Sequence, residues 1–165
     1  MQELTIDLQN YTADAPIFHR TAVRGIICRD GHYLLIHSKY GDYKFPGGGM
    51  EQGERLTDTL LREVREETGY EVVPESIRAF LLVHERRRGA QDDLLMMDSY
   101  YFFCDVSDIA GERNLDAYEQ EYDYQIIWMT LEDAIAAASE AAGNLTDVPW
   151  VQRELTVMRE LLGET

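Results

Sequence analysis

The chain has few cysteines, few basic residues and no long apolar run. Its two cysteines, Cys28 and Cys104, each lie in an apolar segment of strand-like composition, so we expect buried structural thiols rather than redox or metal-binding groups. No segment approaches the roughly 18 consecutive apolar residues that a membrane span needs, and the N-terminus lacks the basic and apolar regions of a secretion signal. We therefore expect a soluble, cytoplasmic protein that does not enter a membrane.

The shortage of basic residues gives the chain a strongly acidic balance. Lysine and arginine total 15 against 31 aspartates and glutamates, a net charge of −16 at pH 7. Such a surface repels polymeric nucleic acids and anionic lipids, so we expect neither as a partner. A small anionic substrate meets the same repulsion unless bound cations locally reverse the field. The composition is thus compatible with metal-dependent chemistry on a small anion.

The apolar pattern predicts one domain, residues 1–165, in which strands and helices are mixed. Residues 1–20 are expected to form an N-terminal strand and a connector, and the Asp30-Gly31 step favours a hairpin. The expected strands are 21–28, 32–37, 43–45, 78–85, 94–106 and 124–129, with a loop over 107–123; the expected helices are 57–68, 131–142, which Gly143 ends, and a last one that Pro149 opens. This order predicts an α/β sandwich.

One segment, Gly48 to Tyr70, carries a distinctive spacing of glycines and charged residues. Seven positions of this pattern each require one particular residue type, and here they are Gly48, Glu54, Arg62, Glu63, Glu66, Glu67 and Gly69. With common residues at about 7% usage each, a chance match has odds on the order of one in a hundred million per window. The segment resembles the signature of the Nudix hydrolases, apart from Tyr70, where that family prefers a bulky aliphatic residue.

The three glutamates of the expected helix indicate a site for a hard divalent cation. Glu63, Glu66 and Glu67 occupy positions i, i+3 and i+4, beside an apolar sector that can pack inward. Carboxylate oxygens suit Mg²⁺ or Mn²⁺, whereas zinc would call for histidine or cysteine, which this segment lacks.

The resemblance implies a fold, an activity and roles for particular residues. The implied fold is an α/β/α sandwich with a mixed sheet, a signature loop and helix, and C-terminal helices. The implied activity is metal-dependent cleavage of a nucleoside diphosphate linked to another moiety. The implied metal ligands are Glu63, Glu66, Glu67 and the backbone carbonyl of Gly47, with Mg²⁺ as the expected ion and Mn²⁺ as its substitute; Glu66 and Glu67 are also expected to be catalytic, with Arg62 orienting a glutamate and Glu54 in support.

The general base has three candidate sources. Members of the family take it from the signature helix or from a loop ahead of a late strand. Here that loop holds Glu119 and Glu121, just before the strand expected at 124–129. We favour Glu121 over Glu119 or a signature glutamate as the base that withdraws a proton from the attacking water.

Substrate-binding residues are expected outside the signature. Tyr40 precedes the glycine turn and could stack on a base, while Arg86 and Arg88 belong to the one basic cluster of an acidic chain and could meet a phosphate. We expect a nucleoside triphosphate or related nucleotide as substrate; the alternatives are a nucleotide sugar or ADP-ribose, and a non-catalytic ligand-binding regulator. An isomerase of the type that shares this fold would need a catalytic cysteine near the site, and the position of Cys28 and Cys104 in apolar runs disfavours that activity. The habit of the family also makes a homodimer an expectation.

Overall fold

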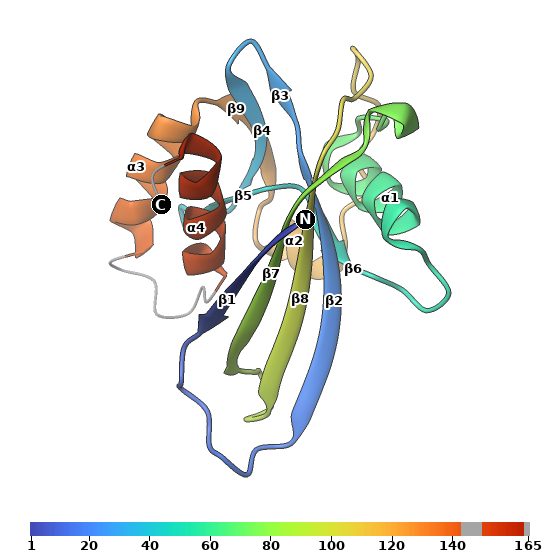
Figure 1. The fold of residues 1–165 in the computed structure, drawn as a ribbon. Coiled ribbons are helices and arrows are strands. Elements are labelled where there is room, and N and C mark those ends of the chain that lie inside the picture. The colour runs from blue at the N-terminus through green and yellow to red at the C-terminus, as the bar shows by residue number, and fades with distance from the viewer. Residues whose placement is uncertain (143–149, 164–165) are drawn as a thin grey trace.

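The computed structural model of the protein describes residues 1–142 and 150–163. Figure 1 shows strands at the centre and helices on both sides. The strands are β1 Gln2–Asp7, β2 Ile17–Ile26, β3 Cys28–Arg29, β4 His32–His37, β5 Tyr43–Lys44, β6 Gly47–Gly49, β7 Arg78–Arg88, β8 Leu94–Phe103 and β9 Gln125–Met129. The helices are α1 Leu56–Thr68, the short 3₁₀ turn Pro74–Ser76, α2 Ala117–Glu121, α3 Leu131–Ala142 and α4 Val151–Leu162.

Two sheets form the central layer. The larger has the order β1-β7-β8-β2-β6, in which β1 with β7 and β2 with β8 are parallel while the other pairs are antiparallel. The smaller has the order β3-β4-β5, with β9 antiparallel to β4. The predicted mixed sheet is therefore confirmed.

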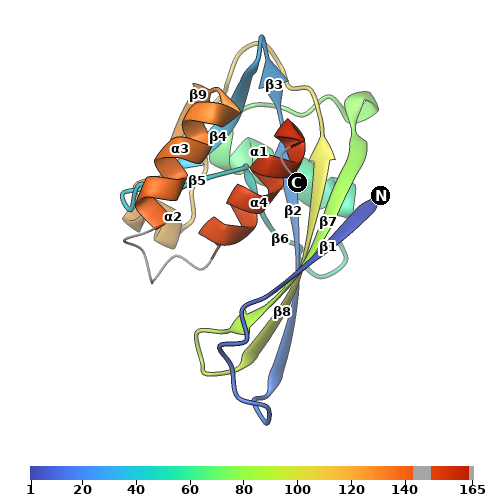
Figure 2. The same cartoon turned by 60° about the vertical axis from the view of Figure 1, so that its left-hand side comes forward.

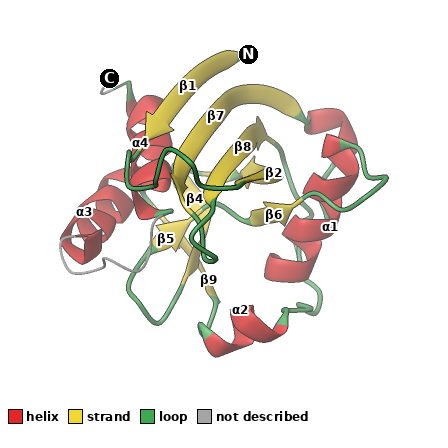
Figure 3. Ribbon diagram, turned by 90° about the horizontal axis from the view of Figure 1, so that it is seen from below, coloured by secondary structure: helices red, strands yellow, loops and turns green. Residues whose placement is uncertain are grey.

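Helices cover opposite sides of these strands. Seen from below in Figure 3, α1 lies on one side and α3 and α4 lie on the other. Leu60 and Val64 of α1 pack on Val23 and Ile27 in one apolar cluster, and Met158 of α4 belongs to a second cluster. Because both faces are covered, β2 is buried on both sides over 22–26 rather than on alternate residues. The α/β/α sandwich is confirmed.

One end of the large sheet extends beyond the helices. In Figures 1 and 2 the β7–β8 hairpin and the start of β2 run on below the helical layers. The strands expected at 78–85 and 94–106 leave a tip over 86–93 between them, but β7 continues to Arg88, so the turn of this hairpin is shorter. β2 likewise begins at Ile17, inside the region that we expected to be a connector. The extension thus presents a strand surface beside the signature loop.

Three further expectations differ from the structure or lie outside it. The expected loop over 107–123 contains the short helix α2. Cys104 is buried as expected, but Cys28 is exposed, because it follows the buried Ile27 and alternation turns its side chain to solvent at the start of a two-residue strand. Gly143 and Pro149 lie outside the described residues. Within the described residues, no helix has the length and apolar character to cross a membrane.

Candidate active site

The signature segment forms strand β6, a loop and helix α1. The helix begins after Arg55, whose backbone N–H donates to Asp58 Oδ2 at 3.0 Å, and ends at Gly69 in the left-handed conformation. Its apolar face buries Leu60 and Val64 completely. That packing holds the glutamates of the adjoining sector toward β6, where the site forms.

A glycine permits the close approach of β6 and α1. A Cβ atom on Gly48 would lie 2.6 Å from Cδ and both carboxylate oxygens of Glu63. Real Cβ contacts are never so short, so any side chain at this position would displace Glu63. Gly48 therefore has a steric role in placing the carboxylate.

Three carboxylates from distant parts of the chain meet at this point. Glu63 and Glu67 come from α1 and Glu119 from α2, and each offers an oxygen within 4.8 Å of the other two. All three are buried, with Glu67 completely inaccessible. Burial raises the pKa of Glu67 to about 7, against an opposing effect of Lys44, and burial also raises the pKa of Glu63. We name Glu63, Glu67 and Glu119 the acidic cluster.

The acidic cluster fits a divalent cation. Its donors are hard carboxylate oxygens, and no histidine or cysteine shares the grouping. Two cations lie beside the cluster, with Lys44 Nζ 3.4 Å from Glu67 Oε1 and Arg62 Nη1 2.7 Å from Glu63 Oε1, and together they do not neutralise three carboxylates. A bound divalent cation would supply the missing charge and favour the ionised carboxylates.

Arg62 links the loop to the helix. Its Nε and Nη2 donate to Glu54 at 2.6 and 2.9 Å, its Nη2 also donates to the Gly49 carbonyl at 3.0 Å, and its Nη1 donates to Glu63 Oε1 at 2.7 Å. The paired hydrogen bonds from Arg62 lower the pKa of Glu54 to about 2, and the pKa of Arg62 itself is raised. Arg62 thus contacts both Glu54 and Glu63, while the roles expected for Arg62 and Glu54 stay predictions.

Glu66 and Gly47 lie beside the acidic cluster rather than in it. The side chain of Glu66 is about one-third exposed and accepts from Arg62 Nη1 at 3.3 Å. The N–H of Gly47 donates to Glu67 Oε2 at 2.8 Å, whereas its carbonyl accepts from Arg24 Nη1 at 3.4 Å. The metal roles of Glu66 and of the Gly47 carbonyl therefore stay predictions.

The structure places Glu119 in the cluster and leaves Glu121 outside it. Two residues on a helix point about 200° apart, so the two side chains of α2 face opposite ways. Glu119 is 3% exposed, and it accepts from Asp116 N at 2.8 Å and from Tyr118 Oη at 3.2 Å. Glu121 is exposed. The loop folds into a capped helix that turns Glu119 rather than Glu121 toward the signature glutamates, and the identity of the general base stays a prediction.

A cavity of about 350 Å³ adjoins the acidic cluster. We call it the inner cavity; its lining contains five basic side chains and no acidic one. The lining residues are Arg20, Arg24, Lys44, Gly47, Gly48, Arg87, Met97, Tyr118, Tyr122, Tyr124, Trp150 and Arg153. In a chain of net charge −16, the lining of this cavity is therefore locally basic.

Buried acids behind the inner cavity hold its cations in place. Glu154 of α4 lies 3.6 Å from Arg24 Nε and accepts from Arg153 Nε and Nη2, each at 3.1 Å. Glu85 accepts from Arg87 Nε at 2.6 Å. Among the described residues, Arg24 Nε is buried without a hydrogen-bond partner. The guanidinium groups are thus pre-positioned, and Arg24 retains an unused donor.

The expected substrate residues lie mostly outside this cavity. Tyr40 is 39% exposed and makes an edge contact with Tyr122, with centroids 5.2 Å apart, and it does not line the inner cavity. Arg86 is exposed on the face of β7 opposite Arg87, and Arg88 pairs with Asp92 near the hairpin turn. The strand continues through the expected tip, so Arg87, between the two residues that we expected, faces inward.

Sequence reasoning missed several residues of the inner cavity. Arg20, Arg24 and Lys44 are scattered through strand segments, and nothing in their spacing signals a common site. Alternation along β2 offers a partial signal, since Arg20 and Arg24 fall on one strand face. Arg153 lies on the last helix, α4, and a single arginine within a helix gives no signal of a shared site.

Comparisons with known proteins agree with this geometry. Residues 18–151 match the family model described as the NUDIX domain. The chain is 31% identical over 133 residues to nucleoside triphosphatase NudI of Klebsiella pneumoniae subsp. pneumoniae, covering 78% of this chain and 94% of that protein. It is 29% identical over 122 residues to nucleoside triphosphatase NudI of Escherichia coli, covering 70% and 85%.

Solved structures share the fold at lower identity. A NUDIX hydrolase from Nitrosomonas europaea aligns with a TM-score of 0.58 at 21% identity, over 84% of this chain and 87% of that one. An ADP-ribose pyrophosphatase from Streptococcus suis aligns with a TM-score of 0.52 at 17% identity, over 69% and 75%. At such identities the likeness concerns the arrangement of the chain alone.

Proposed function

The chain belongs to the Nudix hydrolase family and hydrolyses diphosphate bonds, and from this premise we propose that its substrate is a nucleoside triphosphate. One observation carries the proposal: a cavity lined by five basic side chains and no acid opens beside the buried acidic cluster. A polyphosphate requires cations along its length and a hard-metal site at the bond that breaks. The nucleoside triphosphatases among the relatives support the same substrate class.

The reaction adds water across one phosphoanhydride bond. A nucleoside triphosphate and water would give a nucleoside monophosphate, pyrophosphate and a proton. Glu63, Glu67 and Glu119 would hold the divalent cation, which is expected to be Mg²⁺ with Mn²⁺ as its substitute. When bound, the cation acidifies water and neutralises phosphate charge.

The protein's own groups divide the remaining work. Arg20, Arg24 and Arg87 would bind the phosphates within the inner cavity, and buried acids already align Arg24 and Arg87. We assign the general base to Glu119, because its carboxylate lies in the cluster and is oriented by the Asp116 N–H and the Tyr118 hydroxyl. It would take the proton of the attacking water.

A substrate panel tests the proposed function. The protein is incubated with Mg²⁺ or Mn²⁺ and each of the ribo- and deoxyribonucleoside triphosphates, ADP-ribose, a nucleotide sugar and a dinucleoside polyphosphate. We expect equal amounts of nucleoside monophosphate and pyrophosphate from a triphosphate. Faster turnover of ADP-ribose or a nucleotide sugar would replace the proposed substrate with that class. Tight binding of a nucleotide without turnover would support a regulator instead.

Adjacent arginines on β7 supply a matched pair for the phosphate site. Arg87 lines the inner cavity, and Arg86 is exposed on the opposite face. A hydrogen bond to a charged group contributes about 1.5–3 kcal/mol, so Arg87→Ala should raise the KM for the triphosphate by at least about tenfold. Arg86→Ala should leave it within about twofold. Equal effects of the two substitutions would contradict the placement of the phosphates.

A further inference from the structure

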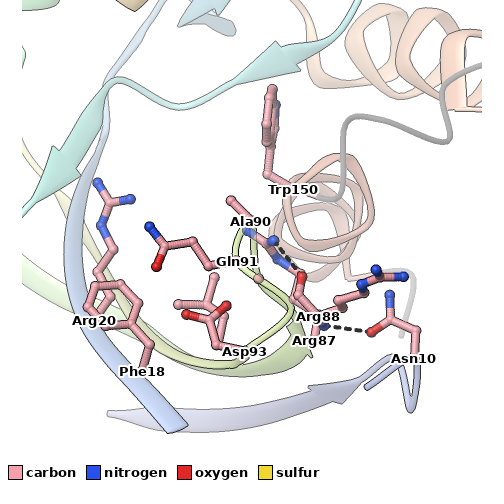
Figure 4. A pocket seen from close by; sticks show the side chains of 11 residues that line it. Asn10, Phe18, Arg20, Arg87, Arg88, Ala90, Gln91, Asp93 and Trp150 are labelled. Carbon is pink, nitrogen blue, oxygen red and sulfur yellow. Dashed lines mark hydrogen bonds between the residues drawn. The ribbon is translucent and has the colours of Figure 1, made fainter. Parts of the chain in front are cut away.

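A second cavity, of about 760 Å³, lies over the extended end of the large sheet. We call it the outer cavity, and Figure 4 shows its side chains converging from β2, the β7–β8 hairpin, the segment after β1 and the start of α4. Its lining residues are Asn10, Phe18, Arg20, Arg87, Arg88, Gly89, Ala90, Gln91, Asp93, Leu95 and Trp150. None of these residues belongs to the acidic cluster.

The outer cavity continues the inner one. Arg20, Arg87 and Trp150 line both, so they form the junction between the two spaces. The acidic cluster, the inner cavity and the outer cavity therefore follow one another along the molecule. A substrate whose reacting bond lies at the cluster can reach the outer cavity through this junction.

The junction is built for a charged or phosphorylated link. Arg20 takes part in no ion pair among the residues that the structure describes, and its guanidinium lies against Gly49, where a Cβ would be 2.9 Å from Nη2. Arg87 is fixed by Glu85 at 2.6 Å. Trp150 is fixed by its indole N–H, which donates to Asp42 Oδ2 at 2.7 Å. Two guanidinium groups and one indole face thus flank the passage.

The two cavities differ in chemistry. The inner cavity has five basic residues, whereas the outer one adds the apolar side chains of Phe18, Ala90 and Leu95. Its arginines are Arg20 and Arg87 at the junction and Arg88, which pairs with Asp92. At the hairpin turn, Gln91 offers an amide and Asp93 has a buried Oδ1 without a partner in the described part of the chain. The apolar side chains and the unpartnered Asp93 oxygen suit a flat ring with apolar faces and a polar edge, and the Asp93 carboxylate disfavours a phosphate at the turn.

Phe18 is an exposed aromatic side chain at the outer cavity. It is 54% exposed, next to Ile17, which is 58% exposed on the opposite face of β2. Only Phe18 lines the outer cavity. An exposed aromatic ring at the rim of a cavity is a typical stacking surface for a planar ligand.

We propose that the outer cavity binds the nucleobase of the substrate, with Phe18 stacking on the ring and Gln91 and Asp93 facing its polar edge. The proposal rests on the proposed function, since it requires the triphosphate to occupy the inner cavity. Arg20 and Arg87 then hold the α-phosphate, which lies next to the nucleoside. The β7–β8 hairpin turn, rather than the signature helix, would then determine which nucleobase the protein prefers.

The test compares two neighbouring substitutions against a ligand with a base and one without. KM is measured for the best triphosphate of the panel, and Ki is measured for inorganic tripolyphosphate as a competitive inhibitor. Because stacking of a base on an aromatic residue changes binding by about 1–3 kcal/mol, Phe18→Ala should raise KM about tenfold. The Ki of tripolyphosphate should not change. Ile17→Ala should change neither constant, and Phe18→Tyr should keep KM near that of the wild type.

The outcomes separate this proposal from the proposed function. Wild-type protein that turns over no triphosphate would refute the proposed function. Wild-type turnover with equal KM for Phe18→Ala and Ile17→Ala would refute the outer-cavity proposal alone. A rise in both KM and the Ki of tripolyphosphate would also overturn it, because Phe18 would then act on the phosphate site. An effect confined to nucleotide sugars would assign the cavity to the second moiety and contradict a base.

Discussion

Replacing Glu154 with glutamine should destabilise the protein strongly, because this carboxylate joins α4 to both sheets. Its side chain is 1% exposed. It accepts hydrogen bonds from Phe45 N at 3.0 Å, Tyr101 Oη at 2.8 Å and the Arg153 guanidinium. Burial would raise the pKa of Glu154, but Arg153 and Arg24 hold the pKa below its usual value. The group is therefore a buried anion at neutral pH.

The magnitude follows from what the substitution leaves behind. Glutamine keeps one acceptor oxygen but removes the charge that compensates Arg153 and Arg24. Breaking a buried ion pair by removing one partner costs about 3–5 kcal/mol, a large part of the 5–15 kcal/mol that is typical of a whole domain. With a urea m-value of about 2 kcal/mol/M, the unfolding midpoint should fall by about 2 M.

The assay is urea unfolding at pH 7, followed by circular dichroism. Glu160→Gln is the matched control on the same helix, since among the described residues the Glu160 side chain accepts one exposed hydrogen bond, from Gln2 Nε2 at 3.3 Å. The control should lie within about 0.5 kcal/mol of the wild type. A loss below about 1 kcal/mol for Glu154→Gln would refute the view that this carboxylate compensates the arginines of the inner cavity.

Three further predictions concern the metal site, the signature glycine and a titrating pair. Glu67→Gln should keep the fold and weaken Mn²⁺ binding by at least about tenfold, as measured by calorimetry, because it removes one of three carboxylates that share the site; unchanged affinity would contradict the metal assignment. Gly48→Ala should lower turnover by displacing the Glu63 carboxylate, with little loss of stability because the clashing atoms end a flexible side chain. Gly111→Ala, whose Cβ would meet one atom of the described residues at 3.4 Å, should leave turnover unchanged, and equal effects would count against the steric role of Gly48. Hydrogen bonds from His84 to Asp98 and to Glu3 raise the pKa of His84 above 6.5. The wild type should therefore be more stable than His84→Gln below pH 6.5, and the difference should vanish as the pH rises through the folded pKa. A difference in urea unfolding that does not depend on pH would contradict this linkage.

Local patterns predicted the part of the site that depends on one segment. Arg62, Glu63 and Glu67 lie on one short helix, so their spacing alone determines that they share a region. The hairpin at Asp30-Gly31 and the end of α1 at Gly69 could be predicted for the same reason, because turn residues and helix-ending glycines act over a few positions.

Residues whose role depends on distant contacts could not be predicted in this way. Glu119 and Glu121 are equivalent in sequence until the loop folds into α2, and then the helix geometry selects Glu119. Arg87 was not predicted to bind substrate, although Arg86 and Arg88 were, because the length of β7 determines which of the three side chains faces the inner cavity. Arg153 and Glu154 are charged residues on an amphipathic helix, and only tertiary packing shows that they are buried.

The two glutamates of α2 provide the most direct test of the acidic cluster as the catalytic centre. Steady-state turnover of the best triphosphate with saturating Mg²⁺ is compared for Glu119→Gln and Glu121→Gln, and glutamine at either position preserves size and helix capping. We predict that Glu119→Gln lowers kcat by at least about 100-fold, as expected for loss of a general base, while Glu121→Gln stays within about twofold of the wild type. Normal turnover in Glu119→Gln, or a larger loss in Glu121→Gln, would contradict the assignment.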